Sequence, residues 1–375
     1  MTDKTGKSRN INFLIDKSDL NKQTFEYSDS SVELQEGQVR LAVDKFALTA
    51  NNVTYAAFGD AIGYWHFFPC TDEKFGRVPV WGFADVIESR HSEVGTGERF
   101  YGFLPISTEL VVTPVSVSKS GFVDGADHRQ SLPSIYNQYT SVSGDPAYVQ
   151  ALEAQQMILR PLFMTSFLIE DFLTENENFG AERVILSSAS SKTAIGVAYQ
   201  IAHAEHRVAE LVGLTSMGNK EFVAELGLYD TVTDYDDIEE LDPDRPTVFI
   251  DIAGNGSVIR RLHGHIGEQL KYSCLVGAAH WDADSASTDS LEPKPVWFFA
   301  PDQFQKRVGE IGASTVLIKV SAAWSGFVGA TNKWMDIVEL HGEESIQQTF
   351  SQLLAGTAPP SKAFVLSLTD GTPLN

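Results

Sequence analysis

The sequence has 375 residues, 43% of them hydrophobic and 21% charged, a composition that predicts a folded globular chain with room for two domains. Its 50 acidic residues outnumber the 28 basic ones, and the net charge of -22 argues against nucleic acid and anionic membrane surfaces as partners. With two distant cysteines, Cys70 and Cys274, and no run of roughly 20 apolar residues, we expect a cytoplasmic protein without disulfides or a membrane span.

Short strands dominate the first third of the chain. Apolar and polar residues alternate over 38–47, as in a strand with one buried face. Two further short apolar runs, 78–89 and 109–114, are separated by glycine- and proline-containing turns such as 94–101. This pattern predicts a β-rich domain, either a small barrel or a sandwich.

A polar segment and a helix follow these strands. Residues 124–146 are rich in Ser, Gly, Asp and Pro but carry the aromatic and amide residues of 136–139, which favours an ordered loop over a linker. Residues 147–175 have the length and spacing of a helix, which we expect Pro161 to break. This helix is predicted to lead into the second domain.

Strands and helices alternate in the middle of the chain. Residues 182–188 form a short β-branched run, 193–206 have helical spacing, and 209–214 are again a short apolar run, which together predict a βαβ unit. The same alternation continues with a helix at 220–226 and strands at 230–233, 246–253 and 272–277. Such alternation predicts an α/β fold with a doubly wound parallel sheet.

Five blocks of the sequence stand in the order found in one enzyme superfamily. They are QVRLAVDKFALTANNVTY, VGTGERFYGFLP, ERVILSSASSKTAIGVAYQIA, LVGLTSMGNKEFVAELGLYDTVTDY, and TVFIDIAGNGS with CLVGAAHWD. Through them the chain resembles the zinc-independent, quinone-oxidoreductase-like side of the medium-chain dehydrogenase/reductase superfamily. The phrases YWHFFP, VWGFADV and LSSASSKTAIG resemble its branch known only as domain of unknown function 2855.

The resemblance implies two domains and a redox function. It places a Rossmann-type dinucleotide-binding domain at 159–299 and a β-rich, GroES-like barrel domain for the substrate at 1–158 and 300–375. A strand at 361–368 would close the second of these. The implied activity is an NADP(H)-dependent oxidoreductase acting on a small molecule, in a homodimer of the kind common in the superfamily.

The phosphate-binding loop departs from the pattern of the superfamily. Where three glycines are expected, this chain has Ser188, Ser191 and Ala194. Serine hydroxyls can donate to phosphate oxygens and a lysine adds positive charge at a helix N-terminus. We therefore predict that the cofactor contacts the residues around this turn: Ser188, Ser190, Ser191, Lys192, Thr193 and Ala194. The alternative is that the serine-rich turn only caps a helix.

The end of the second strand of the βαβ unit indicates which cofactor is used. An acidic residue there would bind the ribose of NAD, and this chain has none. It offers Thr215, Ser216, Asn219 and Lys220, which suit a 2′-phosphate and favour NADP(H), although an ordinary helix N-cap is the alternative. The resemblance adds Thr165 beside the nicotinamide, and Gly254, Gly277 and Ala278 after the fourth and fifth strands.

Catalysis is predicted to need no metal. Zinc-dependent relatives have a His-Glu pair where this chain has Trp81-Gly82-Phe83, and no nucleophile elbow or P-loop motif occurs. We therefore expect a metal site to be absent.

The resemblance places the substrate-side groups on Asn52, Thr54 and Tyr55, with Tyr55 as proton donor and Tyr64 as its rival. Trp65, Phe67 and Phe68 either wall a pocket for an apolar or aromatic substrate or belong to the core. The predicted reaction is reduction of an activated C=C or C=O bond. The alternative is a non-catalytic ligand-binding protein that has kept the dehydrogenase fold.

Overall fold

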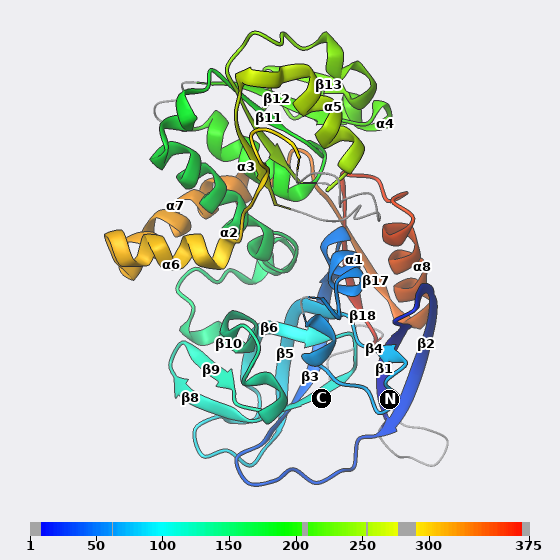
Figure 1. Cartoon of the computed structure of the whole chain (residues 1–375). Coiled ribbons are helices and arrows are strands. Elements are labelled where there is room, and N and C mark those ends of the chain that lie inside the picture. The colour runs from blue at the N-terminus through cyan, green and yellow to red at the C-terminus, as the bar shows by residue number, and fades with distance from the viewer. Residues whose placement is uncertain (1–8, 62, 205–208, 253, 277–289, 370–375) are drawn as a thin grey trace. The chain divides into compact units, whose positions relative to one another are not determined.

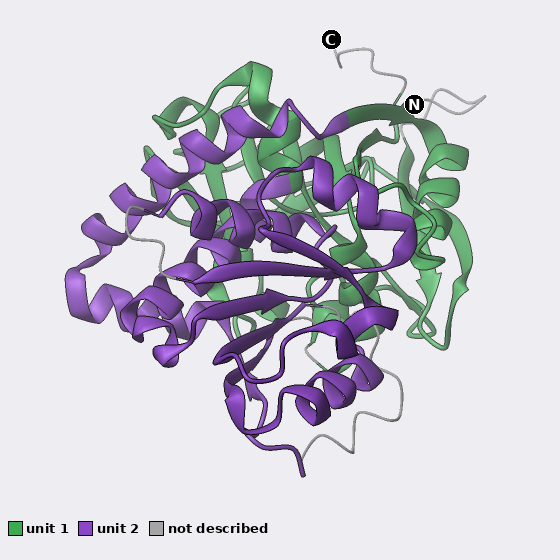
Figure 2. Cartoon of the chain, turned by 90° about the horizontal axis from the view of Figure 1, so that it is seen from above, with its two compact units in different colours: residues 1–158, 337–375 green, residues 159–336 purple. Residues whose placement is uncertain are grey.

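The computed structural model describes residues 9–61, 63–204, 209–252, 254–276 and 290–369 (Figure 1). The chain divides into two compact units, coloured separately in Figure 2: unit 1 comprises 1–158 and 337–375, and unit 2 comprises 159–336. The first boundary falls inside helix α2 (Glu153–Glu175) and the second at the start of strand β17 (Asp336–His341). Unit 1 is therefore discontinuous in sequence.

Unit 1 is mainly β structure. Its strands are β1 (Arg9–Asp16), β2 (Asp19–Asp29), β3 (Val39–Leu48), β4 (Phe75–Gly76), β5 (Pro79–Ser89), β6 (Arg99–Pro105), β7 (Glu109–Val112), β8 (Pro114–Ser118), β9 (Gly121–Asp124), β10 (Gln138–Ser141), β17 and β18 (Lys362–Ser367). Its helices are α1 (Ala50–Ala57), α8 (Gly342–Leu354) and the short 3₁₀ turns η1 (Tyr64–His66), η2 (Asp127–Arg129), η3 (Ser134–Asn137), η4 (Val142–Gly144) and η5 (Gln150–Leu152). The strand expected at 361–368 is β18, which pairs antiparallel with β3 and so returns the chain to this unit.

The large sheet of unit 1 is built around β3. Its order is β17-β18-β3-β5-β6-β10-β9-β8, and β7 also pairs with β3. Because β3 has neighbours on both edges and is covered on both faces, only Asp44 and Lys45 in it are partly exposed. The strand expected at 38–47 is present. The alternation of apolar and polar residues there predicted one buried face, but the structure buries both faces of the strand.

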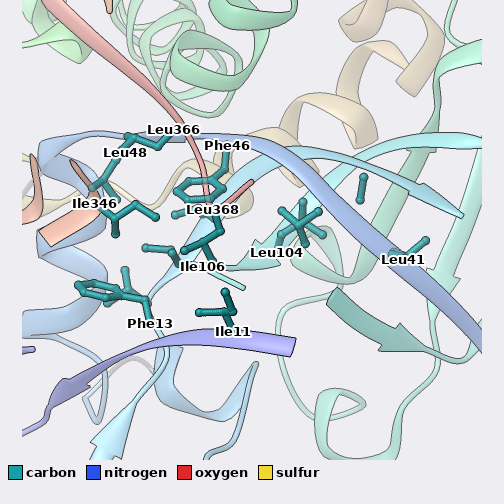
Figure 3. Close-up of a cluster of buried hydrophobic side chains, with 14 of the residues drawn as sticks. Ile11, Phe13, Leu41, Phe46, Leu48, Leu104, Ile106, Ile346, Leu366 and Leu368 are labelled. Atoms are coloured by element: carbon teal, nitrogen blue, oxygen red, sulfur yellow. The ribbon is translucent and has the colours of Figure 1, made fainter. Parts of the chain in front are cut away.

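The core of unit 1 draws side chains from both ends of the chain. Ile11 and Phe13 of β1, Leu41 and Phe46 of β3, and Ile346 of α8 lie together in Figure 3. Leu366 and Leu368, at the end of the chain, complete the same cluster. Burial of this apolar surface holds the C-terminal segment in the unit.

Unit 2 contains a parallel sheet with helices. Its strands are β11 (Arg183–Leu186), β12 (Glu210–Thr215), β13 (Thr231–Asp234), β14 (Thr247–Asp251), β15 (Leu270–Leu275) and β16 (Val296–Trp297). Its helices are the rest of α2, α3 (Lys192–Ala202), α4 (Met217–Glu225), α5 (Gly256–Ile266), α6 (Ala300–Ile311), α7 (Ala313–Thr331) and the 3₁₀ turns η6 (Glu177–Gly180), η7 (Tyr235–Glu240) and η8 (Gly267–Gln269).

The order of this sheet is β13-β12-β11-β14-β15-β16, and all of its pairings are parallel. Numbered from its first strand, the sheet therefore has the order 3-2-1-4-5-6 of the Rossmann fold. The strands β11 and β14 at its centre are buried throughout, as continuous apolar runs in parallel sheets usually are. The predicted doubly wound parallel sheet is confirmed.

Several expectations differ from the structure: for example, strand β10 lies within the segment 124–146 that was expected to be a loop, and the helix expected from 147 begins at Glu153. Helix α2 continues through Pro161, whose missing N–H costs one hydrogen bond without ending the helix. The turn expected at 94–101 ends earlier, because β6 begins at Arg99. The domain boundary expected at 300 lies at 336/337, because α6 and α7 belong to unit 2.

Helices α6 and α7 are joined to α2 by specific contacts. Arg307 of α6 lies 2.6 Å from the carboxylate of Asp171, and the rings of Phe327 and Phe163 are 5.1 Å apart. Helix α7 also has the length and hydropathy of a membrane-spanning helix, with a mean hydropathy of 1.2 and 17% of the window buried. Such a window was not expected from the sequence, and the charged Lys319 lies in the middle of this helix.

Candidate functional site

The loop 187–191, which we call the serine loop, joins β11 to α3 in unit 2. The strand order reverses between β11 and β14, so the carboxyl ends of these two strands form the topological switch point of the sheet. In open α/β sheets, ligands bind in the crevice outside the strands at this point. The fold therefore places the serine loop where a nucleotide is bound in Rossmann domains.

Ser187 fixes the beginning of the serine loop. Its hydroxyl donates to Oδ1 of Asp251 at 2.6 Å and accepts the N–H of Ile252 at 2.8 Å. The other carboxylate oxygen of Asp251 accepts the N–H of Gly254 at 2.7 Å. Because Ser187 and Asp251 are both fully buried, these bonds join the ends of β11 and β14 in a medium where polar groups need partners. Sequence reasoning missed both residues, although an acidic residue ending the apolar run of β14 was a usable signal.

Ser188 occupies the backbone conformation that usually calls for glycine. Its φ is +48°, in the left-handed region, and its N–H donates to the hydroxyl of Tyr235 at 2.8 Å. The next residue, Ala189, donates its N–H to Leu214 and accepts the hydroxyl of Tyr229 at 3.1 Å. Burial raises the pKa of both tyrosines, so their hydroxyls stay protonated. The turn therefore forms without the usual glycines, and it is held by hydrogen bonds to Tyr235 and Tyr229. Sequence reasoning missed both tyrosines.

The end of the serine loop begins α3. The hydroxyl of Ser190 accepts from the amide of Asn219 at 3.1 Å, and Ser191 is the N-cap, accepting the N–H of Ala194 at 3.2 Å. Lys192 and Thr193 form the first turn of the helix, where the positive end of the helix dipole lies. Burial lowers the pKa of Lys192 to about 8. The turn is thus an N-cap and also carries a lysine at a helix N-terminus.

A close contact with α2 explains the glycine in α3. A Cβ at Gly196 would lie 2.5 Å from the hydroxyl oxygen of Ser166, which itself bonds to the carbonyl oxygen of Thr193 at 2.9 Å. The predicted cofactor residue Thr165 is the half-buried neighbour of Ser166 in α2. Ser166, which sequence reasoning missed, thus connects that part of α2 to the first turn of α3.

The residues predicted to select the cofactor lie at the end of β12. Thr215 ends the strand and is buried, Ser216 is the N-cap of α4, and neither is acidic. Asn219 bonds to the serine loop, and the ammonium of Lys220 lies 3.6 Å from the carboxylate of Asp237. The serine loop and the end of β12 are therefore one connected structure.

The predicted glycines after the later strands are only partly described. Gly254 follows β14 with a φ of +72°, so a side chain would strain the backbone there. Gly277 and Ala278 lie outside the described residues.

The candidate catalytic residues of unit 1 begin with Asn52 in α1. Its side-chain oxygen accepts the N–H of Thr49 at 2.7 Å, which makes it part of the capping box of this helix. Its amide nitrogen donates to the carbonyl oxygen of Pro79 at 2.8 Å. The structure therefore gives buried Asn52 an anchoring role, while Thr54 lies half-buried two residues further along α1.

Tyr55 and Tyr64 meet in an aromatic cluster. Their ring centroids are 4.3 Å apart, and the hydroxyl of Tyr64 lies 3.2 Å from that of Tyr136. Burial raises the pKa of both candidate proton donors above the usual range. We define the aromatic cluster by its buried members and the partly buried ones around them: Tyr55, Tyr64, Phe67, Phe68, Phe103, Trp81, Leu110, Leu132 and Tyr136.

The tryptophan next to Tyr64 lies elsewhere. Trp65 belongs to the main core of unit 1, where its ring fills the space beside Gly59 and Gly76. Of the three aromatic residues predicted to wall a pocket or to pack in the core, Trp65 is therefore a core residue. Phe67 and Phe68 are buried within the aromatic cluster.

The described part of the chain holds no group of three or more His, Cys, Asp or Glu side chains that could bind a metal. Trp81 and Phe83 stand where the resemblance places the zinc-binding pair. The ring of Trp81 stacks on Tyr101 of β6 at 5.5 Å, and the ring of Phe83 packs against the same tyrosine at 5.3 Å in a tilted arrangement.

A comparison with protein families matches residues 46–359 to the description "Protein of unknown function (DUF2855)". The chain belongs to this family. A comparison with curated proteins finds no match.

Several solved structures have a similar fold. CurA from Vibrio vulnificus in complex with NADPH is 13% identical with a TM-score of 0.62, covering 96% of this chain and 99% of that one. A mutant enoyl thioester reductase from Candida tropicalis is 11% identical with a TM-score of 0.55, covering 96% and 100%. The quinone oxidoreductase from Coxiella burnetii is 12% identical with a TM-score of 0.52, with the same coverage. The DUF2855 chain thus has the two-domain fold of the medium-chain dehydrogenase/reductase superfamily, with Rossmann and GroES-like domains.

Proposed function

We propose that this DUF2855 protein is an NADPH-dependent, metal-independent oxidoreductase that reduces an activated C=C or C=O bond of a small apolar or aromatic molecule. The observation that carries the proposal is the serine loop, a preformed turn at the switch point of a 3-2-1-4-5-6 sheet that leads into a helix N-terminus bearing Lys192. The NADPH complex of CurA, which has the same fold, supports it.

The residues present fit a dinucleotide. In this proposal the first turn of α3, with Lys192 and Thr193, holds the diphosphate, and the hydroxyls of Ser188, Ser190 and Ser191 line the same turn. The buried carboxylate of Asp251 accepts bonds from Ser187 and Gly254, so the fold itself stabilises this negative charge. When bound, the nucleotide supplies the hydride.

The end of β12 supports NADPH over NADH. NAD-specific Rossmann domains have a carboxylate at this position, which binds the ribose and would repel a 2′-phosphate. This chain has Thr215 and Ser216 there instead, and Lys220 in the following helix provides a cation. Its partner Asp237 is 3.6 Å away and both side chains are more than a third exposed, so this pair is weak. Lys220 can therefore turn to a phosphate at little cost.

The substrate side of the proposal rests on the aromatic cluster of unit 1. Tyr55 and Tyr64 carry their protons at neutral pH, as phenols do, and burial raises the pKa of both further. Each is therefore a protonated hydroxyl from which the substrate can take a proton. Thr54 is a further hydroxyl on α1, whereas the amide of Asn52 anchors that helix. The aromatic rings around them favour an apolar or flat substrate.

A second function is supported by a specific observation. The N–H of Ser188 and the hydroxyl of Ser190, both candidate phosphate contacts, already have partners in Tyr235 and Asn219. In a non-catalytic ligand-binding protein that kept the dehydrogenase fold, these groups would not need to contact a phosphate, and their bonds within the protein would only stabilise the loop.

We also propose a cytoplasmic homodimer. Among the described residues, strand β16 forms one edge of the parallel sheet, and Val296 and Trp297 on it are 45% and 47% exposed. An exposed apolar edge strand favours pairing with another chain.

The reaction is tested by a screen for NADPH consumption. Purified protein is mixed with NADPH and a panel of enones, quinones and aldehydes, and the loss of nicotinamide absorbance is followed. Parallel reactions use NADH and the variant Lys192→Ala. We expect consumption that depends on the acceptor, is faster with NADPH, and is strongly reduced in the variant. Binding of NADPH without consumption of it by any acceptor would favour the non-catalytic function.

A further inference from the structure

The loop between β9 and β10 is built around one buried cation. Arg129 is 1% exposed and donates Nη1 to Asp124 at 2.9 Å and to the hydroxyl of Tyr139 at 3.0 Å. Its Nε donates to the side-chain oxygen of Asn137 at 3.0 Å, and its Nη2 to the carbonyl oxygen of Tyr136 at 2.7 Å. Because all three nitrogens of the guanidinium have partners, Arg129 fixes the backbone that carries Tyr136.

Stacking contacts fix the arginine in turn. The guanidinium lies 5.5 and 5.1 Å from the ring centroids of Phe67 and Phe68, both members of the aromatic cluster. The loop and the segment that follows Tyr64 are therefore joined through one residue.

The ring of Tyr136 is held by other members of the aromatic cluster. Its centroid lies 5.3 Å from that of Phe67 and 4.7 Å from that of Phe103, and the rings of Tyr136 and Tyr64 are 5.9 Å apart in an edge arrangement at 79°. In this position its hydroxyl lies 3.2 Å from that of Tyr64. Tyr64 is 9% exposed and Tyr136 is half-buried, so few other arrangements of the two hydroxyls are open to them.

We propose that Tyr136 is a positioning residue that aims the hydroxyl of Tyr64 and makes Tyr64, rather than Tyr55, the proton donor. The inference rests on the reductase function proposed above. In a pair of hydroxyls only one proton lies between the two oxygens. If Tyr136 donates that proton, the proton of Tyr64 is free to point at the substrate.

The step balances in charge and protons. A substrate that has taken up a hydride carries a negative charge on its oxygen, or at the carbon conjugated to it. The O–H bond of Tyr64 breaks, its proton passes to that atom, and a phenolate remains on Tyr64. The hydroxyl of Tyr136 stabilises this phenolate with a charge-assisted hydrogen bond until water returns the proton.

Tyr55 has a different place in the cluster. Its ring packs on Tyr64 at 4.3 Å and on Phe103 at 5.7 Å, and at 5% exposure it is buried more deeply than Tyr64. We assign it to supporting the ring of Tyr64.

The test uses the full-length protein with NADP⁺ and 4-nitrophenol as the probe. The oxygen of its phenolate mimics the negative oxygen that the donor meets, and its absorbance distinguishes the ionised from the neutral form. Titrations are compared for the wild type and for Tyr64→Phe, Tyr136→Phe and Tyr55→Phe. Tyr27→Phe is the matched control, because it removes the hydroxyl of a 51% exposed tyrosine that bonds to Glu343.

We expect the wild type to bind the phenolate form. Tyr64→Phe and Tyr136→Phe should weaken that binding by roughly 10-fold to 100-fold, as for loss of a hydrogen bond to a charged group, and should lower the ionised fraction of the bound probe. Tyr27→Phe should behave as the wild type. A defect that is only structural would weaken both forms of the probe equally.

Three results would overturn the inference: no phenolate binding by the wild type, unchanged binding by Tyr136→Phe, or a larger loss in Tyr55→Phe than in Tyr64→Phe. NADPH binding, followed by nicotinamide fluorescence on the same proteins, separates this outcome from failure of the proposed function. If the wild type binds NADPH and only the tyrosine results fail, the reductase proposal stands. If the wild type binds no NADPH, both fall.

Discussion

The hydroxyl of Ser187 lies 2.6 Å from Oδ1 of Asp251, and this buried contact joins the carboxyl ends of β11 and β14. The same carboxylate holds the N–H of Gly254. The carboxylate of Asp251 therefore links the ends of the two paired strands between which the sheet order reverses, and with them the start of the serine loop.

Replacing Asp251 should destabilise the protein because hydrogen-bond donors near it would lose their acceptor. Asp251→Ala removes the acceptor of the Ser187 hydroxyl and of the Gly254 N–H, and we expect the free energy of unfolding to fall by about 3 kcal/mol. Urea unfolding followed by tryptophan fluorescence measures this. Asp236→Ala, at an exposed position, is the control and should change stability little. An equal loss in the two variants would contradict this account of Asp251.

Gly196 should not tolerate even a methyl group. A Cβ there would lie 2.5 and 2.9 Å from the side-chain atoms of Ser166, so Gly196→Ala should lower the free energy of unfolding by about 1–3 kcal/mol through overpacking. Gly264→Ala, at an exposed position in α5 with no atom within 4 Å, should instead raise it by about 0.5–1 kcal/mol. Thermal unfolding of both variants tests the contrast. If both raise the melting temperature, α3 does not pack on α2 as described.

The charge of Lys192 should make cofactor binding depend on pH. Burial lowers its pKa to about 8, so the folded apo protein loses this charge as the pH rises through 8. We expect NADPH affinity to fall by about 10-fold between pH 7 and pH 9.5, and Lys192→Met to be weaker at pH 7 and flat over that range. Fluorescence titrations at several pH values measure this.

The same lowered pKa affects folding with a definite sign. Between pH 8 and 10 the unfolded chain holds the Lys192 proton more tightly than the folded one, so this residue should make the apo protein more stable as the pH rises. Lys192→Met should lack that increment. If the difference in free energy of unfolding between the wild type and Lys192→Met does not change with pH, the burial assigned to Lys192 is contradicted.

Lys220 should select between the two nicotinamide cofactors. Lys220→Ala removes the cation proposed for the 2′-phosphate, so NADPH affinity should fall by about 10-fold while NADH affinity stays the same. Asp237→Asn releases Lys220 from its partner at 3.6 Å and should leave NADPH binding intact or strengthen it. Equal losses for both cofactors in Lys220→Ala would show that the lysine does not read the phosphate.

Local patterns were enough to predict the strands of unit 2 from β11 to β15 and the helices α3 and α4. They did not give α5 or β16, and α6 and α7 fell in the segment expected to belong to the other domain. The strands β11, β12 and β14 are short apolar runs separated by helical spacing, and this signal is contained in neighbouring residues. The Rossmann type of the domain followed from the resemblance of the blocks, whereas the strand order came from the structure. The N-cap at Ser191 was likewise readable from a serine before a helical pattern.

Contacts between distant residues could not be predicted from such patterns. Tyr235 reaches the N–H of Ser188 across 47 positions, and nothing in the sequence near either residue indicates it. The boundary at 336 depends on Phe327 packing against Phe163, a partner that the sequence of α7 does not reveal. Helix α2 continues through Pro161 although the proline removes one backbone hydrogen bond. Whether a helix continues past a proline depends on how it packs, and the local sequence does not show this.

The candidate site shows the same division. The residue types of the serine loop suggested phosphate binding, but how each serine is held became visible only with Asp251, Tyr235 and Asn219 in place. Tyr64 was one of two candidates in the sequence, and its partner Tyr136 lies 72 positions away.

The most direct test of the central claim is a titration of the purified protein with NADPH and NADH, followed by nicotinamide fluorescence, for the wild type, Lys192→Ala and Gly264→Ala. We predict that the wild type and Gly264→Ala bind NADPH more tightly than NADH, and that Lys192→Ala weakens both. Binding of neither nucleotide by the wild type, or equal binding by all three proteins, would contradict the claim that the serine loop and Lys192 hold a dinucleotide.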